Sequence, residues 1–100
     1  MKKQNTLFIT DEAYLDILDA HVWYNTLAKG LGDEFEQHLE KELNRLLKNP
    51  KLFQNKYKNI RVAYLEKFPY GIHYLIDENI LKVVAVFHTS RNPQNWEDRL

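Results

Sequence analysis

The sequence contains no cysteine, so disulfide bonds and thiolate metal sites are excluded. It also lacks an HExxH metal motif, a glycine-rich phosphate loop and a GxSxG nucleophile motif, so neither a metal site nor a cofactor site is expected. No apolar run is long enough for a signal peptide or a membrane span. These absences favour a cytoplasmic protein that works without a cofactor and without a membrane.

An excess of charge of one sign is lacking as well, because 14 Lys and Arg residues balance 14 Asp and Glu residues. The balance is uneven along the chain: residues 1–50 hold six basic and nine acidic residues, whereas residues 51–100 hold eight and five. A basic second half could attract nucleic acid or an acidic partner, but we prefer an ordinary solvated surface as the explanation. With 100 residues, the chain is expected to form one domain, residues 1–100.

The segment Ile60–His88 organises the rest of the chain. It contains three runs rich in β-branched and aromatic residues, which are separated by breakers at Pro69 and at Asp77–Asn79. Runs and breakers of this kind predict a three-stranded antiparallel meander. The third run, Ile80–His88, is too apolar for a strand with one wet face, so it is expected to lie inside the sheet.

Strand pairing assigns each side chain of the meander to one of two faces. We expect Ile76 to lie opposite Leu81 across a four-residue loop. One face is then almost wholly apolar and must pack against another layer. Its members are Tyr70, Ile72, Tyr74, Ile76, Leu81, Val83, Ala85 and Phe87, joined by Val62 and Tyr64. A slip of one residue would put this core in water.

The opposite face of the meander gathers its polar side chains. If Glu66 lies opposite Tyr70, Arg61 joins His73 and His88 on this face, over aliphatic neighbours. At about 3.3 Å per residue, the two histidines are then roughly 13 Å apart along the sheet. They therefore cannot both act on one phosphate unless the chain after His88 folds back.

The first half of the sequence predicts a short strand followed by two helices. Asn5–Ile9 is expected to be an edge strand, and Thr10 is expected to cap the first helix. Gly30 ends this helix, and Asn49–Pro50 ends the second. Because the connector between the helices is short, they should lie antiparallel as a helical hairpin.

Two segments are less regular. Lys51–Asn59 carries basic and aromatic residues, which suit either a connector with aromatic anchors or a loop that contacts RNA. After His88, Pro93 excludes a continuation of the last strand inside the sheet. The predicted order is β-α-α-β-β-β. This is an α+β fold in which the helical hairpin packs on one face of a small, mainly antiparallel sheet.

Several residues occur together in the order that characterises one family. The most specific are Arg61, Phe68-Pro69-Tyr70, Tyr74 and the ending His88-x-x-Arg91-x-Pro93-x-x-Trp96-x-x-Arg99. Weaker signals are Ala13 with Asp16-Ile17, Gly30-Leu31-Gly32 and Asn49-Pro50. With these residues, nearly the whole chain resembles the RelE/ParE superfamily of bacterial type II toxins, and most of all its ParE-like (plasmid stabilisation) branch.

The resemblance implies a small cytoplasmic toxin that inhibits growth and is neutralised by a cognate antitoxin. The antitoxin would dock on the helical hairpin or on the open face of the sheet. Some members of the superfamily bind DNA gyrase, whereas others are ribosome-dependent endoribonucleases that cut mRNA, and the fold does not decide between them. Our first interpretation is a target-binding toxin that blocks DNA gyrase. The alternatives are a ribosome-dependent mRNA endoribonuclease and a decayed toxin that only binds its antitoxin.

For a nuclease, the chemistry needs a cation that holds the phosphate and groups that transfer protons. Arg61 and Arg91 are the candidates for holding the phosphate, because a guanidinium fork matches phosphate oxygens. His73 or His88 is the candidate for proton transfer, because imidazole titrates near neutral pH. These four residues are catalytic candidates only if the protein is a nuclease.

For target binding, the candidates are four basic residues: Lys56, Lys58, Arg61 and Arg91. Arg91 is the first choice among them, because it follows the last strand, where a rigid sheet would present it. Tyr74 is expected to point into the core and to have a structural role. The sequence offers no compact group of His, Tyr and Lys side chains, which favours binding over catalysis.

Overall fold

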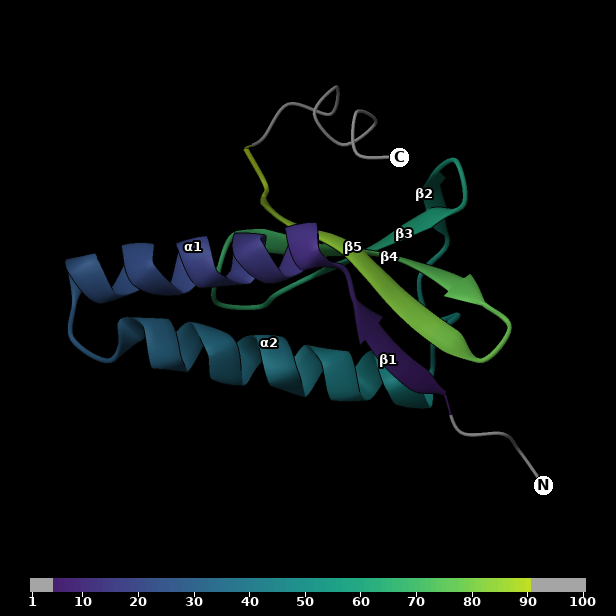
Figure 1. Ribbon diagram of the computed structural model, residues 1–100, viewed down its shortest axis with the longest axis horizontal. Helices are drawn as coiled ribbons and strands as arrows, with labels where there is room; N and C mark the ends of the chain where they lie inside the picture. The colour runs from purple at the N-terminus through teal and green to yellow at the C-terminus, as the bar shows by residue number, and fades with distance from the viewer. Residues whose placement is uncertain (1–4, 91–100) are drawn as a thin grey trace.

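The structure, a computed structural model, describes residues 5–90. Its elements are β1 (Thr6–Ile9), α1 (Asp11–Leu27), α2 (Leu31–Lys48), β2 (Asn55–Tyr57), β3 (Ile60–Tyr64), β4 (Tyr70–Asp77) and β5 (Ile80–His88). The strands form one sheet in the order β1-β5-β4-β3-β2, and the two helices run side by side as an antiparallel hairpin that packs on one of its faces (Figure 1). The predicted α+β class is therefore confirmed. Neither described helix is long and apolar enough to cross a membrane.

The beginning of the chain forms the predicted elements. β1 is an edge strand that runs parallel to β5, and β5 lies inside the sheet between β1 and β4. Thr10 caps α1, because its Oγ1 accepts a hydrogen bond of 3.1 Å from the N–H of Ala13. The predicted order lacked one strand, because Asn55–Tyr57 pairs antiparallel with β3. Three residues without apolar alternation give no strand signal in the sequence.

The hairpin of β4 and β5 starts in the predicted register and then departs from it. Ile76 lies opposite Leu81, as predicted. The pairing shifts between His73 and Tyr74, where Val84 of β5 has no partner in β4. One extra residue in one strand is a β-bulge, and it exchanges the two faces of β5 beyond it.

The bulge overturns part of the predicted face assignment. Ala85 lies opposite His73, so Ala85 and Phe87 belong to the face away from the helices, although both were predicted for the helix-covered face. Val86 and His88 take their places on the helix-covered side, and Val86 belongs to the core that the helices cover. The sequence does not signal this exchange, because the β5 residues around the bulge, residues 83–87, are all apolar and suit either face.

The pairing of β3 with β4 also differs from the prediction. Glu66 does not lie opposite Tyr70; instead the N–H of Leu65 donates to the carbonyl of Tyr70 at 2.9 Å, and Arg61 lies opposite Tyr74. A shift of one residue moves the odd-numbered residues of β3 to the helix-covered face and the even-numbered ones to the opposite face. The side predicted for Arg61 was therefore wrong.

An aromatic cluster joins the two helices to the sheet. Phe68, which precedes β4, packs edge-on against Tyr24 of α1 with ring centroids 4.9 Å apart and against Phe35 of α2 at 5.4 Å. Tyr70 of β4 lies 5.2 Å from Phe35. Edge-to-face contacts of this kind are favourable beyond the burial of area alone. The loop before β4 is thus fixed to both helices.

The hairpin of the two helices requires glycine at one point of close approach. Gly32 lies in the first turn of α2, and a Cβ there would collide with the backbone oxygen of His21 and with the side chain of Asn25. The same Asn25 accepts a hydrogen bond of 2.8 Å from the N–H of Gly32. Gly30, in the preceding turn, has a φ of +83° but open space around its Cα.

We predict that Phe68→Ala lowers the free energy of unfolding by about 3–5 kcal/mol, because the ring is buried between both helices and leaves a cavity. Phe8→Ala is the matched control, because the Phe8 side chain is 53% exposed, and it should cost less than about 1 kcal/mol. Urea denaturation of both variants measures the difference. Equal midpoints for the two variants would contradict the role of the cluster.

We also predict that Gly32→Ala destabilises the protein by about 1–3 kcal/mol, because α1 and α2 must move apart to admit the added methyl group. Gly30→Asn should cost less, since asparagine tolerates a positive φ and meets no neighbour there. Thermal unfolding followed by circular dichroism compares the two variants. A Gly32→Ala variant as stable as the unchanged chain would show that the helices do not approach closely at this point.

Candidate functional site

Three candidate catalytic residues named from the sequence, Arg61, His73 and His88, do not converge in the structure. Arg61 lies opposite Tyr74 and His88 lies opposite Tyr70, so both belong to the helix-covered face. Four residues of β4 separate these positions, which corresponds to about 13 Å along the strand. His73 lies on the other face of the sheet. The prediction that one face gathers all three was wrong, because the register shifts in β3 and β5 move two of them.

The guanidinium of Arg61 holds a loop. Its Nη1 donates a hydrogen bond of 2.6 Å to the carbonyl of Phe53. The same loop is held by the Tyr74 hydroxyl, which donates to the carbonyl of Pro50 at 3.0 Å, and by the Arg45 guanidinium, 5.9 Å from the Phe53 ring centroid. Burial raises the pKa of Tyr74, so its phenol is a neutral donor at pH 7. Tyr74 lies in the core, as predicted.

His73 is enclosed by side chains. Only 1% of the surface of His73 is exposed. A histidine that is so deeply buried normally has a hydrogen-bond partner. Its Nδ1 lies 2.9 Å from the hydroxyl of Tyr57, and its ring packs edge-on against Phe87 with centroids 5.1 Å apart. An imidazole in this position joins β2, β4 and β5 and has no open path to a substrate.

Of the two candidate histidines, His88 is the exposed one, and its contacts lie at the end of β5. Its Nδ1 accepts a hydrogen bond of 3.1 Å from the N–H of Ser90 and lies 2.7 Å from the Ser90 hydroxyl. The ring packs edge-on against Tyr70, with centroids 5.3 Å apart. These contacts orient the imidazole and hold the chain as it leaves the sheet.

The basic candidates for target binding lie at the β2–β3 end of the sheet. Lys56 donates a hydrogen bond of 3.0 Å to the hydroxyl of Tyr64, and its ammonium lies 5.4 Å from the Tyr64 ring centroid. Lys58 lies in the turn between β2 and β3, where its φ is +48°. Arg61 points to the opposite face, so it does not join them. Arg91 lies outside the described residues.

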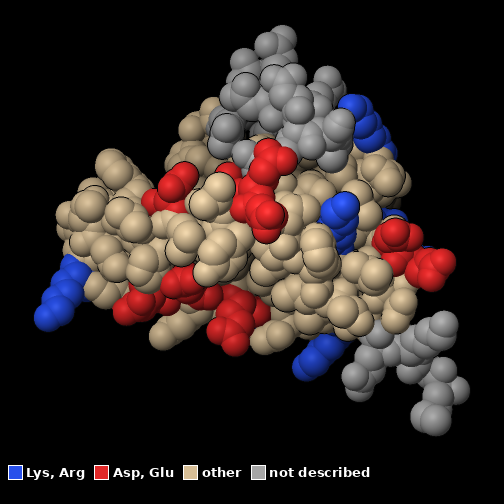
Figure 2. Space-filling model, viewed as in Figure 1, with Lys and Arg blue, Asp and Glu red and all other residues tan. Residues whose placement is uncertain are grey.

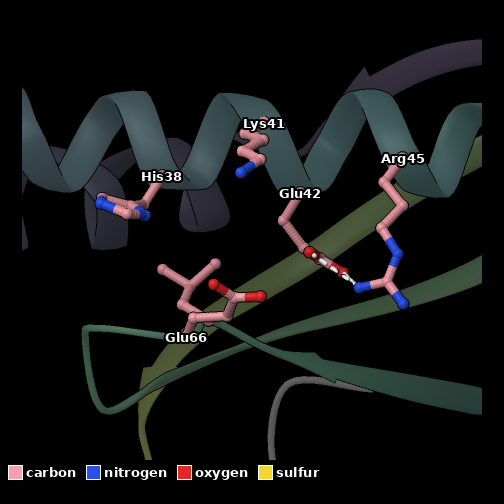
Figure 3. Close-up of a pocket in the computed structure, with 6 residues that line it drawn as sticks. His38, Lys41, Glu42, Arg45 and Glu66 are labelled. Atoms are coloured by element: carbon pink, nitrogen blue, oxygen red, sulfur yellow. Dashed lines mark hydrogen bonds and ion pairs between the residues drawn. The ribbon is translucent and has the colours of Figure 1, made fainter.

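A pocket of about 290 Å³ lies between α2 and the segment after β3 (Figure 3). Its lining consists of His38, Lys41, Glu42, Arg45, Leu65 and Glu66. Glu42 is buried and pairs with Arg45 at 3.3 Å, as the dashed line in Figure 3 shows. Sequence reasoning missed this pocket. The usable signal was the spacing of His38, Glu42 and Arg45, which places them on one face of a helix.

The helical hairpin carries one group that could hold a metal ion. His21 of α1 lies with Asp33 and Glu36 of α2, and one ligand atom of each lies within 4.8 Å of the others. The same side chains link the two helices: His21 Nδ1 lies 2.6 Å from a carboxylate oxygen of Glu36, which is an ion-pair distance, and its Nε2 lies 3.1 Å from the Asn25 amide nitrogen. Since Asn25 Oδ1 accepts from Gly32, the amide NH₂ faces the imidazole, which assigns the His21 proton to Nδ1.

α1 exposes an unusual amount of apolar surface. Leu15, Leu18 and Val22, which we call the outer stripe, are 58%, 39% and 60% exposed and recur at helical spacing. Tyr14, Trp23 and Leu27 are more than half exposed as well. Figure 2 shows a broad uncharged area over α1, with acidic side chains above and below it. Exposed apolar patches rimmed by polar residues mark sites where proteins bind partners.

Several solved structures share the fold of this chain. The chain resembles a solved structure described as a chromosomal ParDE TA system from P. aeruginosa, with a TM-score of 0.76 and 13% identity over 85% of this chain and 96% of that chain. A free-state mutant of the E. coli toxin RelE matches with a TM-score of 0.54 and 17% identity over 88% of this chain and 86% of that chain. The isolated E. coli RelE toxin matches with a TM-score of 0.57 and 18% identity over 94% of this chain and 94% of that chain. At these identities, the likeness shows the fold.

The family assignment rests on the sequence. No curated protein matches the chain. The family described as the ParE toxin of the type II toxin–antitoxin system parDE, however, matches residues 7–93, which include every described helix and strand except the first residue of β1. This match extends over far more than half of the chain. The chain therefore belongs to the ParE family of type II toxin–antitoxin toxins.

Proposed function

We propose that this protein inhibits growth by binding a target macromolecule, DNA gyrase, and that it does not cut RNA. The observation that carries the proposal is the separation of Arg61, His73 and His88. A ribonuclease needs its phosphate-holding cation within reach of the groups that move protons. In residues 5–90 the cation holds a loop, one histidine is enclosed, and the other lies at the far end of the sheet.

The family also supports gyrase over the ribosome. The resemblance to the ParE-like branch implies a toxin that blocks its target without hydrolytic chemistry, and the ParE family matches most of the chain. The likeness to RelE is weaker by TM-score and concerns the fold only. An mRNA endoribonuclease therefore has less support, and it would have to depend on Arg91 together with one exposed histidine, His88.

The proposed target-binding residues are Lys56 and Lys58, at the β2–β3 end of the sheet, and Arg91. Lys56 lies there beside Tyr64, which is 44% exposed, and Lys58 lies in the turn between β2 and β3. Lysines beside an exposed aromatic ring suit an acidic surface or a nucleic-acid backbone, because they offer charge and stacking area together. A complex of gyrase with DNA presents surfaces of both kinds. The proposed place of action is the cytoplasm.

A cognate antitoxin is proposed to cover the outer stripe of α1. Leu15, Leu18 and Val22 form an apolar row on the side of the helix away from the sheet, and an amphipathic segment of a partner would remove it from water. Burial of these side chains also explains why α1 is apolar on both sides, since a helix of that kind is normally covered on both. The likeness to a ParDE system supports a partner of this type.

A supercoiling assay tests the proposed target. The purified chain should inhibit supercoiling of relaxed plasmid by DNA gyrase. Arg91→Ala should raise the concentration required by about tenfold or more, the effect of losing one charged hydrogen bond. Lys29→Ala, in the turn between the helices, is the control and should inhibit normally. Full gyrase activity at a stoichiometric excess of toxin, together with cutting of mRNA on ribosomes, would overturn the proposal.

Substitutions in the outer stripe test the antitoxin surface. Leu18→Glu and Val22→Glu should each leave growth arrest intact but weaken neutralisation by an antitoxin, selected from genomic fragments for rescue of growth. A buried carboxylate at this interface should reduce affinity by about tenfold or more. Gln37→Glu adds the same charge on exposed α2 and should be neutralised normally. If all three variants are neutralised equally, the antitoxin does not dock on the outer stripe.

A further inference from the structure

A groove of about 490 Å³ lies between the last turns of α2 and the loop that follows the helix. Its lining within residues 5–90 consists of Lys41, Asn44, Arg45 and Lys48 of α2, with Asn49 and Leu52 after the helix. The groove adjoins the smaller pocket of Figure 3, because Lys41 and Arg45 line both. One side of α2 is therefore concave, and neither the proposed target nor the proposed antitoxin surface uses it.

The groove carries basic side chains and no acidic one in its described lining. Lys41 and Lys48 are exposed, and within residues 5–90 neither forms an ion pair. Arg45 pairs with Glu42 at 3.3 Å, but its side chain is still 55% exposed. Cations in the last turn of a helix offset the negative end of the helix dipole, which accounts for Arg45 and Lys48. It does not account for Lys41, which lies one turn earlier and extends the basic row.

The spacing of the basic row limits what can bind. Lys41 and Lys48 are seven residues apart, so about 10 Å of helix axis separates them. Both long side chains would have to converge to hold one small anion, and fixing them costs conformational entropy. An extended polypeptide covers the same distance with about three or four residues and meets each cation where it lies. The row therefore suits a chain of negative groups better than a single ion.

Leu52 gives the groove an apolar contact beside its basic side chains. Its side chain is 41% exposed, so covering it would remove apolar surface from water. The described lining contains no aromatic ring, the usual platform on which proteins stack the bases of single-stranded nucleic acid. An aliphatic contact beside lysines, without such a ring, favours a polypeptide over a nucleic acid.

We propose that this groove binds an acidic segment of a polypeptide partner, one that combines carboxylates with an aliphatic side chain. Carboxylates of the segment pair with Lys41 and Lys48, and its aliphatic side chain packs on Leu52. Asn44 and Asn49 line the same groove and offer amide groups that can bond to the backbone of the segment. The groove contains none of the proposed target-binding residues and no residue of the outer stripe, so this proposal stands apart from both.

A titration with short peptides tests this site on the full chain. The peptide acetyl-Glu-Glu-Leu-Glu-Glu-amide and its counterpart with glutamine in place of glutamate are added to ¹⁵N-labelled protein. The backbone amides of Lys48 and Leu52 and the side-chain amides of Asn44 and Asn49 are followed by NMR. The acidic peptide should shift these signals with a dissociation constant on the order of millimolar, and its affinity should fall as the salt concentration rises. The glutamine peptide should bind about tenfold more weakly or worse.

Two variants localise the binding. Lys48→Gln, at an exposed position, should weaken the acidic peptide by about threefold and make its affinity less dependent on salt. Leu52→Ala should weaken the peptide by about threefold as well, but with the salt dependence unchanged, because it removes apolar area and no charge. Lys29→Gln removes the same charge from the exposed turn between the helices and should leave the affinity unchanged.

Equal binding of the acidic and glutamine peptides would overturn the proposal, and so would equal affinities for Lys48→Gln and Lys29→Gln. Tighter binding of oligothymidylate than of the acidic peptide at the same amides would make the groove a nucleic-acid site instead. Peptide binding that appears only in the double variant Glu97→Gln, Asp98→Asn would make the chain's own carboxylates the occupants and would also contradict the proposal. None of these outcomes bears on inhibition of gyrase or on neutralisation by an antitoxin.

Discussion

The register of the central strands decides which side chains meet the helices and which do not. A single extra residue, Val84, interrupts the pairing of β4 with β5 and exchanges the faces of β5 beyond it. Before the bulge, Tyr74 faces the core; after it, Tyr70 and His88 stand on the helix side, and His73 is enclosed on the other. Together with the register of β3, this shift separates the candidate catalytic residues.

Much of the fold was predictable, because it depends on local patterns. Thr10 as a cap and Gly30 as a break locate α1, and the alternation of apolar residues locates β4 and β5. The faces beyond the bulge were not predictable, because apolar residues around Val84 suit either side. The short strand Asn55–Tyr57 was missed for the opposite reason, since its polar residues form no pattern.

The candidate site was less predictable than the fold, because it depends on contacts between distant segments. Sequence reasoning placed Tyr74 in the core correctly, but it placed Arg61 on the wrong face. A one-residue difference in the β3–β4 connector exchanges the two faces of β3. One surface of α1 carries the apolar outer stripe, on the side away from the sheet. Such a row suits a binding partner, which agrees with the proposed activity of association rather than hydrolysis.

The central claim is that this ParE-family toxin stops growth by acting on DNA metabolism without RNA chemistry. Pulse labelling of cells just after induction of the chain tests it most directly, with labelled thymidine and leucine followed in parallel. The account predicts that thymidine incorporation falls first, while leucine incorporation continues and mRNA stays intact. An earlier loss of leucine incorporation, with mRNA cut on ribosomes, would contradict it.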